Sequence, residues 1–273
     1  MHERNTKRYA PGLGPYTVDQ LREGDRYELD QGRRVYVAPT GKDGGQSTIS
    51  GGELIVSDPI VKTAGIDIGH ALNEKTLRAP DISVADLTDE PGWHKGAPAL
   101  AVEYAGSGQD EAELKLKIKD LLAAGTRFIW VVRLIGVRHV EVYEPEKPMR
   151  LAHIGDELRA PGVLQNPIPV QAMFDRQLAH ELTLRNLLQR KGYQGLDAVR
   201  EEGHQRGLEE GHQRGLEEGR QALRSTLKSI LLARGFSLDP DQADRLAACH
   251  EMALLERWVG RAVTAPTAAE VFE

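Results

Sequence analysis

The sequence predicts an α/β domain with a mixed β-sheet flanked by helices, followed by an all-α tail. Three observations support this fold class. Short apolar runs of strand length recur in the first part of the chain, and a helical pattern separates two of them. A charged repeat punctuated by glycine begins after residue 192, and helical apolar spacing follows it. The chain of 273 residues also exceeds the usual size of one domain. We therefore expect a domain over 1–192, a repeat helix or linker over 193–222, and a small helical unit over 223–273.

The elements of the first domain can be predicted in order. A short helical pattern ends near Gly24, and the runs YELD and RRVYVAP, joined by Gln31-Gly32, predict a β-hairpin. The next stretch, TGKDGGQSTISGG, is rich in small polar residues and predicts a mobile loop. The remaining predictions are a short helix within 53–61, strands at 82–85, 99–104, 128–134 and 138–144, a helix at 110–124, a closing loop at 165–175 and a helix at 177–191. A helix that connects two buried strands predicts a right-handed crossover within a mixed sheet.

The tail contains an internal repeat with a period of eight residues. EEGHQRGL occurs at 201–208 and again at 209–216, and a less exact copy begins at residue 217. Each glycine in a helix costs about 1 kcal/mol relative to alanine, yet glycines four residues apart would let a second helix approach closely. A solvated linker helix and a self-associating helix both remain open. Metal binding by His204 and His212 is disfavoured, because two helical turns separate them.

The end of the chain predicts helices with a small core. Pro240 lies just inside the start of one helix, and Leu254, Leu255 and Trp258 fall at core positions. Cys249 is the single cysteine in the sequence, which excludes an internal disulfide and a cysteine-based zinc site.

Composition narrows the class of protein. The chain is 40% hydrophobic and 28% charged, as in globular proteins, and it has no apolar run long enough to span a membrane. The N-terminus has no apolar segment after its charges, so we expect a cytoplasmic protein. A net charge of −6 disfavours a protein that simply coats nucleic acid through clustered Lys and Arg.

Two carboxylates at predicted strand ends are candidates for chemistry. Asp81 begins one strand after a proline, and Glu103 ends an apolar strand on the same face as Ala99 and Ala101. A carboxylate there is costly to bury unless it meets a cation, and two such oxygen ligands suit Mg²⁺. From these residues alone, ordinary salt-bridged carboxylates remain an open alternative.

The helix at 110–124 places lysines beside this predicted site. Its buried stripe leaves Lys115 and Lys117 on the two flanks, from which a lysine can extend toward Glu103. A fully solvated lysine face is an equally open interpretation. The stripe itself is predicted to consist of Leu114, Ile118, Leu121 and Leu122.

Taken together, these motifs resemble a known nuclease family. A Pro-Asp strand start, an apolar strand ending in Glu, a lysine-bearing helix that closes on Ala-Gly, and a Trp-bearing strand are typical of the Uma-type restriction endonuclease family, within the PD-(D/E)XK nuclease superfamily. The resemblance covers roughly residues 15 to 190 of this sequence. The matching positions are Pro80-Asp81, Glu103, Lys117, Ala124-Gly125 and Trp130.

The resemblance implies a restriction-endonuclease-like fold and a site. Asp81 and Glu103 would be ligands of Mg²⁺, with Mn²⁺ as a possible substitute, and Lys117 would orient or polarise the attacking water. Glu28 and Lys115 are additional candidates. The superfamily's usual lysine position, two residues after the glutamate, is Ala105 here, whereas in the Uma-type branch the lysine lies on the following helix.

The function expected from this resemblance is metal-dependent endonuclease hydrolysis of nucleic-acid phosphodiester bonds, with DNA as the expected substrate. The alternative is a catalytically silent protein that binds nucleic acid or forms assemblies through the nuclease fold and the helical tail. A homodimer through the tail is expected, because one site per chain cuts both strands of a duplex most simply as a dimer.

Overall fold

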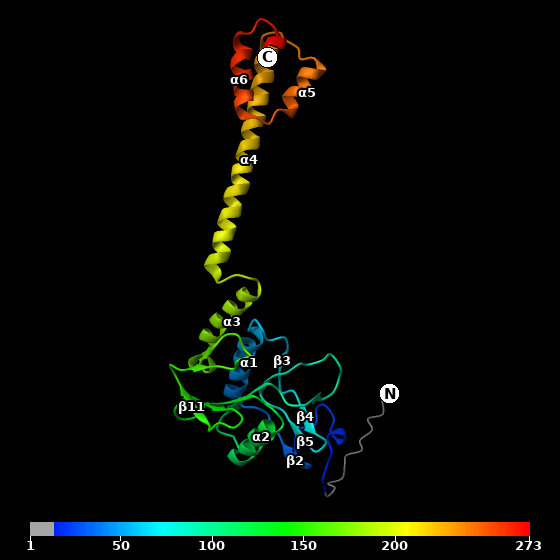
Figure 1. The fold of residues 1–273 in the computed structure, drawn as a ribbon, viewed down its shortest axis with the longest axis vertical. Coiled ribbons are helices and arrows are strands. Elements are labelled where there is room, and N and C mark those ends of the chain that lie inside the picture. Colours follow the sequence, from blue (N-terminus) through cyan, green and yellow to red (C-terminus); the bar gives the residue numbers. More distant parts are fainter. Residues whose placement is uncertain (1–13) are drawn as a thin grey trace. The chain divides into compact units, whose positions relative to one another are not determined.

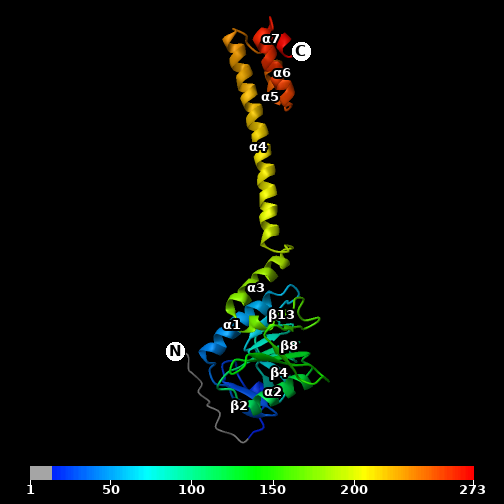
Figure 2. The same ribbon diagram turned by 90° about the vertical axis from the view of Figure 1, so that its left-hand side faces the viewer.

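The computed structural model describes residues 14–273 and divides the chain into two compact units. The first unit extends to Leu196, and the second runs from Asp197 to Glu273. Figures 1 and 2 show the α/β architecture of the first unit and the all-helical second unit in two orthogonal views.

The first unit is built on a mixed sheet with six strands among the described residues, in the order β11-β10-β9-β8-β6-β3. Strands β8 and β9 are parallel and are joined by helix α2, whereas the other neighbouring pairs are antiparallel. The predicted mixed sheet with a helical crossover is confirmed. The elements are β3 (Ala64–Ile66), β6 (Ile82–Val84), β8 (Leu100–Ala105), α2 (Glu111–Ala123), β9 (Phe128–Arg133), β10 (His139–Tyr143) and β11 (Arg150–His153).

Helices cover both faces of this sheet. Helix α1 (Lys42–Ser57) packs on one face and also against α3 (Arg176–Arg190), while α2 lies on the other face. The residues of β8 alternate accordingly: Leu100, Val102 and Tyr104 join the core beneath α1, and Ala101 and Ala105 join the core beneath α2. Residues 100–105 show the predicted alternation, which places Glu103 on the α2 face, whereas Ala99, just before β8, packs against the core beneath α1 and not with Ala101 as predicted.

A second, smaller sheet carries the predicted hairpin. Its strand order is β2-β1-β5-β4-β7, and Gln31 and Gly32, with φ of 49° and 84°, form the tight turn between β1 and β2. Because β1 also pairs with β5 at Leu29↔Leu77, the hairpin lies beside the chain segment that leads to Asp81. The strands are β1 (Tyr27–Asp30), β2 (Arg33–Tyr36), β4 (His70–Asn73), β5 (Thr76–Arg78) and β7 (His94–Lys95).

The mobile loop predicted for TGKDGGQSTISGG is wrong, because most of it forms helix α1. The small residues serve close packing. A Cβ atom on Gly51 would overlap the hydroxyl of the buried Tyr104 on β8. Leu54 and Ile55, one turn further on, are fully buried in the main core. Tertiary packing therefore outweighs the low helix propensity of this segment.

The segment 165–175 is also more regular than the predicted closing loop. It contains strand β13 (Ile168–Pro169), which pairs with β12 (Glu157–Leu158), and a 3-10 turn at Val170–Met173 that is largely buried. A second 3-10 turn, at Val18–Gln20, corresponds to the short helical pattern predicted before Gly24.

The second unit consists of helices. Helix α4 (Leu196–Ala233) includes the whole glycine-punctuated repeat, and its last turns pack with α5 (Pro240–Ala248), α6 (Met252–Thr264) and α7 (Ala268–Val271). Pro240 occupies the first turn of α5, as predicted, and Trp258 is buried against Phe272. Throughout residues 14–273, every helix is too short or too polar to cross a membrane.

Candidate active site

The two predicted carboxylates meet across neighbouring strands. Strand β6 pairs with β8 at Ile82↔Val102, so the antiparallel register places Asp81 opposite Glu103. One carboxylate oxygen of Asp81 accepts a 2.6 Å hydrogen bond from the backbone N–H of Tyr104. This bond holds the Asp81 carboxylate against the backbone of β8.

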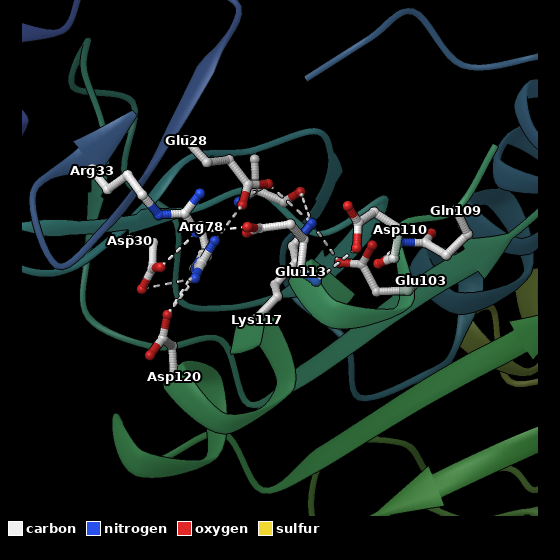
Figure 3. Close-up of polar contacts among 11 residues, drawn as sticks. Glu28, Asp30, Arg33, Arg78, Glu103, Gln109, Asp110, Glu113, Lys117 and Asp120 are labelled. Atoms are coloured by element: carbon white, nitrogen blue, oxygen red, sulfur yellow. Dashed lines mark hydrogen bonds and ion pairs between the residues drawn. The ribbon is translucent and has the colours of Figure 1, made fainter. Parts of the chain in front are cut away.

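Lys117 extends from helix α2 into the same place. Its Nζ lies 2.7 Å from Glu103 Oε1 and 3.0 Å from Glu28 Oε1, and it donates a 2.7 Å hydrogen bond to the carbonyl of Ala79 (Figure 3). These contacts match the three donors of an ammonium group. The structure thus brings Lys117 together with Glu103 and Glu28, whereas Lys115 is exposed on α2.

Burial dominates the electrostatics of this cluster. Burial, helped by the charge of Asp81 and opposed by Lys117, raises the pKa of Glu103 to about 8. Burial likewise raises the pKa of Asp81, against the hydrogen bond from Tyr104 and the charge of Lys117. Burial would lower the pKa of Lys117, but the negative charges of Glu103 and Glu28 outweigh it and raise that pKa. The site therefore has more carboxylates than cations, which favours an added positive charge.

The cluster opens into a cleft of about 1230 Å³ in the first unit. Asp81, Glu103 and Lys117 line it, together with residues of the β1–β2 hairpin and the turn after β8. Asp67 also lines the cleft, just after β3, and burial raises its pKa. Asp67 is not predicted from the sequence, because its neighbours Ile66 and Ile68 form too short an apolar pattern to indicate an edge strand.

A second charged network adjoins the first. It is not predicted from the sequence either. Arg78 at the end of β5 contacts Glu28 on the hairpin and Asp120 on α2. The only signal in the sequence is an arginine within a short apolar run three residues before Asp81. Periodicity alone does not predict its partners, which are distant in the chain.

The donor set fits a hydrated Mg²⁺ ion. Within residues 14–273, no group of three or more His, Cys, Asp or Glu side chains is arranged to hold a metal. At this site Asp81 and Glu103 could supply two carboxylates, with water and substrate oxygens at the other positions, which is how Mg²⁺ is usually bound. The pKa values of both carboxyl groups are raised, and a bound cation would favour their ionised forms.

Comparisons with known proteins agree with this fold. No protein-family model matches the chain, and no curated protein matches it. Among solved structures, it is similar to the crystal structure of a "putative nuclease belonging to DUF820" from Anabaena variabilis ATCC 29413, with 16% sequence identity and a TM-score of 0.53. The alignment covers 60% of this chain and 99% of that chain. The likeness shows that the chain shares the α/β fold of this structure, in agreement with the mixed sheet flanked by helices that was predicted from the sequence.

Proposed function

We propose that the first unit is a Mg²⁺-dependent endonuclease that hydrolyses phosphodiester bonds in nucleic acid, with DNA as its substrate. The observation that supports this most directly is the pairing of Asp81 with Glu103 across two strands, with Lys117 in contact with Glu103 at a cleft. An intact set of these three residues argues against a silent binding module. The lysine on α2, with Ala105 at the usual lysine position, supports assignment to the Uma-type branch.

Each residue has a distinct part in this proposal. Asp81 and Glu103 would hold the metal, which supplies Lewis-acid activation of water and stabilises charge on the phosphodiester. Tyr104 keeps the Asp81 carboxylate oriented through its backbone N–H. Lys117 remains protonated beside Glu103, and its positive charge would polarise the attacking water and stabilise the negative charge that develops on the phosphodiester.

The test is cleavage of supercoiled plasmid and of single-stranded DNA by the purified chain with Mg²⁺ or Mn²⁺. We expect Asp81→Ala and Glu103→Ala each to lower the rate by at least about 100-fold. Asp86→Ala is the matched control, because Asp86 is an exposed carboxylate five residues after Asp81 and does not line the cleft. This control should cleave like the wild type.

Two results would overturn the proposal. Equal cleavage by all four proteins would reveal a contaminating nuclease. DNA binding without cleavage in either metal would identify the unit as a binding module.

A further inference from the structure

Arg78 is a buried cation without a role in the proposed chemistry. Its side chain is only 1% exposed, and its Nε and Nη2 donate hydrogen bonds of 2.9 and 2.6 Å to Asp120 Oδ2. Nη1 lies 3.3 Å from Glu28 Oε2, and Nη2 lies 3.5 Å from Asp30 Oδ1. Figure 3 shows the guanidinium between these carboxylates of β1 and α2.

The partners of Arg78 are also those that hold Lys117. Glu28 offers Oε2 to Arg78 and Oε1 to Lys117, so one carboxylate joins the two cations. Ala79, whose carbonyl accepts from Lys117, is the next residue after Arg78. Asp120 follows Lys117 by three residues on α2, which places both side chains on one side of the helix.

Stability alone does not account for this network. Burying a guanidinium with its carboxylates carries a large desolvation cost, and well-packed apolar residues are often at least as stabilising. What a planar five-donor group provides is a fixed geometry for several acceptors at once. Here the acceptors that Arg78 holds in place are Glu28 on the β1–β2 hairpin and Asp120 on α2, the helix that carries Lys117.

We propose that Arg78 is a positioning residue for Lys117. Its guanidinium fixes Glu28 and helix α2 so that the Lys117 ammonium is held against Glu103. The contribution of this arrangement to catalysis rests on the proposed nuclease function, but the positioning itself does not.

The first experiment is a kinetic double-mutant cycle on the full chain. Arg78→Lys keeps the positive charge and removes the planar guanidinium with its five donors. We expect it to lower kcat by about 10- to 100-fold with little change in KM, and to have no further effect in a Lys117→Met background. Arg133→Lys is the matched control, since Arg133 also pairs with two carboxylates, Glu111 and Glu141, but lies outside the cleft. Equal effects of Arg78→Lys in both backgrounds would overturn the proposal.

The second experiment needs no activity, so it separates this inference from the nuclease proposal. Acetic anhydride labelling of the folded chain, read by mass spectrometry, measures how accessible the Lys117 amine is, with exposed Lys115 as the internal reference. We expect Arg78→Lys and Glu28→Gln each to speed Lys117 labelling at least about fivefold, and Arg133→Lys to leave it unchanged. Labelling of Lys117 at the wild-type rate in folded Arg78→Lys and Glu28→Gln would overturn the inference, even if the wild type proves to be an active nuclease.

Discussion

At the scale of single residues, the first unit keeps several ionisable side chains away from water. Lys117 is an ammonium with only 13% of its side chain exposed, and the two carboxylates beside it keep it charged. Breaking a buried ion pair by removing one partner typically costs about 3–5 kcal/mol. Substitutions in this cluster therefore need a stability control beside any activity measurement.

His70 is buried in the opposite state, as a neutral ring. It lies on β4 of the smaller sheet, and its Nε2 is 2.9 Å from the Ser83 hydroxyl on β6 of the larger sheet. Burial, with smaller contributions from the charges of His94 and Lys117, lowers the pKa of His70 to about 4. The bond between His70 and Ser83 joins the two sheets, and the low pKa keeps the ring neutral at pH 7.

We predict that acid weakens the fold through His70. Between pH 6.5 and pH 4 the unfolded chain binds a proton that the folded chain excludes, so stability falls as the pH falls. From pH 7 to pH 5 this loss amounts to about 2 kcal/mol. Guanidinium unfolding of the wild type and of His70→Asn at both pH values measures it, and the stability gap between the two proteins should narrow by that amount.

His153→Asn is the control for this prediction, because His153 is exposed in the same unit. Its stability relative to the wild type should not change between pH 7 and pH 5. If the difference in stability between the wild type and His70→Asn stays constant with pH, the buried neutral state of His70 is contradicted.

The sequence was sufficient to place three of the site residues and not the others. Strand alternation put Glu103 on the face that α2 covers. Helical spacing put both Lys115 and Lys117 on the flanks of α2, and the family resemblance singled out Lys117, which contacts Glu103. The contacts of Arg78 depend on how the hairpin and α2 pack around β5, which no local pattern encodes. Glu28 entered only through the family resemblance, and its contact with Lys117 is a property of the assembled fold.

At the scale of elements, regular alternation and helical spacing predicted the longer strands and helix α2 well. The shortest strands could not be predicted in this way. Strands β6, β8, β9 and β10 and helix α2 lie close to their predicted ranges because their apolar residues face two covered sides of a sheet. Strands β4, β5 and β7 have two to four residues each, too few to show a period. Only the end of helix α1 falls within the helix predicted at 53–61; its first part was predicted as a loop because glycine has a low helix propensity, although Gly51 packs against the sheet.

We predict that two glycines of α1 respond in opposite directions to alanine. Gly51→Ala should destabilise the first unit by about 1–3 kcal/mol, because its Cβ would overlap the Tyr104 hydroxyl. Gly45→Ala should stabilise it by up to about 1 kcal/mol, since the space around Gly45 is open and alanine favours a helix. Thermal unfolding of the single variants measures both effects.

Tyr104→Phe provides the matched test of the cause. Combined with Gly51→Ala, it removes the overlapping hydroxyl and should recover part of the lost stability. The idea fails if Gly51→Ala is as stable as Gly45→Ala, or if Tyr104→Phe gives no recovery.

At the scale of the whole molecule, the two units have separate hydrophobic cores. The first core lies around the six-stranded sheet, and the second gathers the end of α4 with α5, α6 and α7 around Leu227, Leu255 and Trp258. Every residue named in the candidate site belongs to the first unit. The first unit should therefore fold and keep its site without the second.

We predict that a fragment of residues 1–196 folds, remains monomeric and cleaves DNA with a turnover per site close to that of the full chain. The full chain should be a homodimer through its tail, as expected from the exposed repeat helix. Light scattering after size-exclusion chromatography measures the masses, and near-ultraviolet circular dichroism reports the folding of the fragment. A dimeric fragment would move the interface to the first unit, and a monomeric full chain would remove the dimer altogether.

The exact octapeptide repeat within α4 has a geometric consequence. An α-helix turns by about 100° and rises by about 1.5 Å per residue, so eight residues make two full turns plus about 80° and extend the helix by about 12 Å. Gaining or losing one copy of EEGHQRGL would change the length of α4 by that amount and rotate everything after it by about 80° about the helix axis. The number of repeat copies thus determines both the length of α4 and the rotation between its two ends. Each duplication or deletion of one copy changes both by a fixed amount.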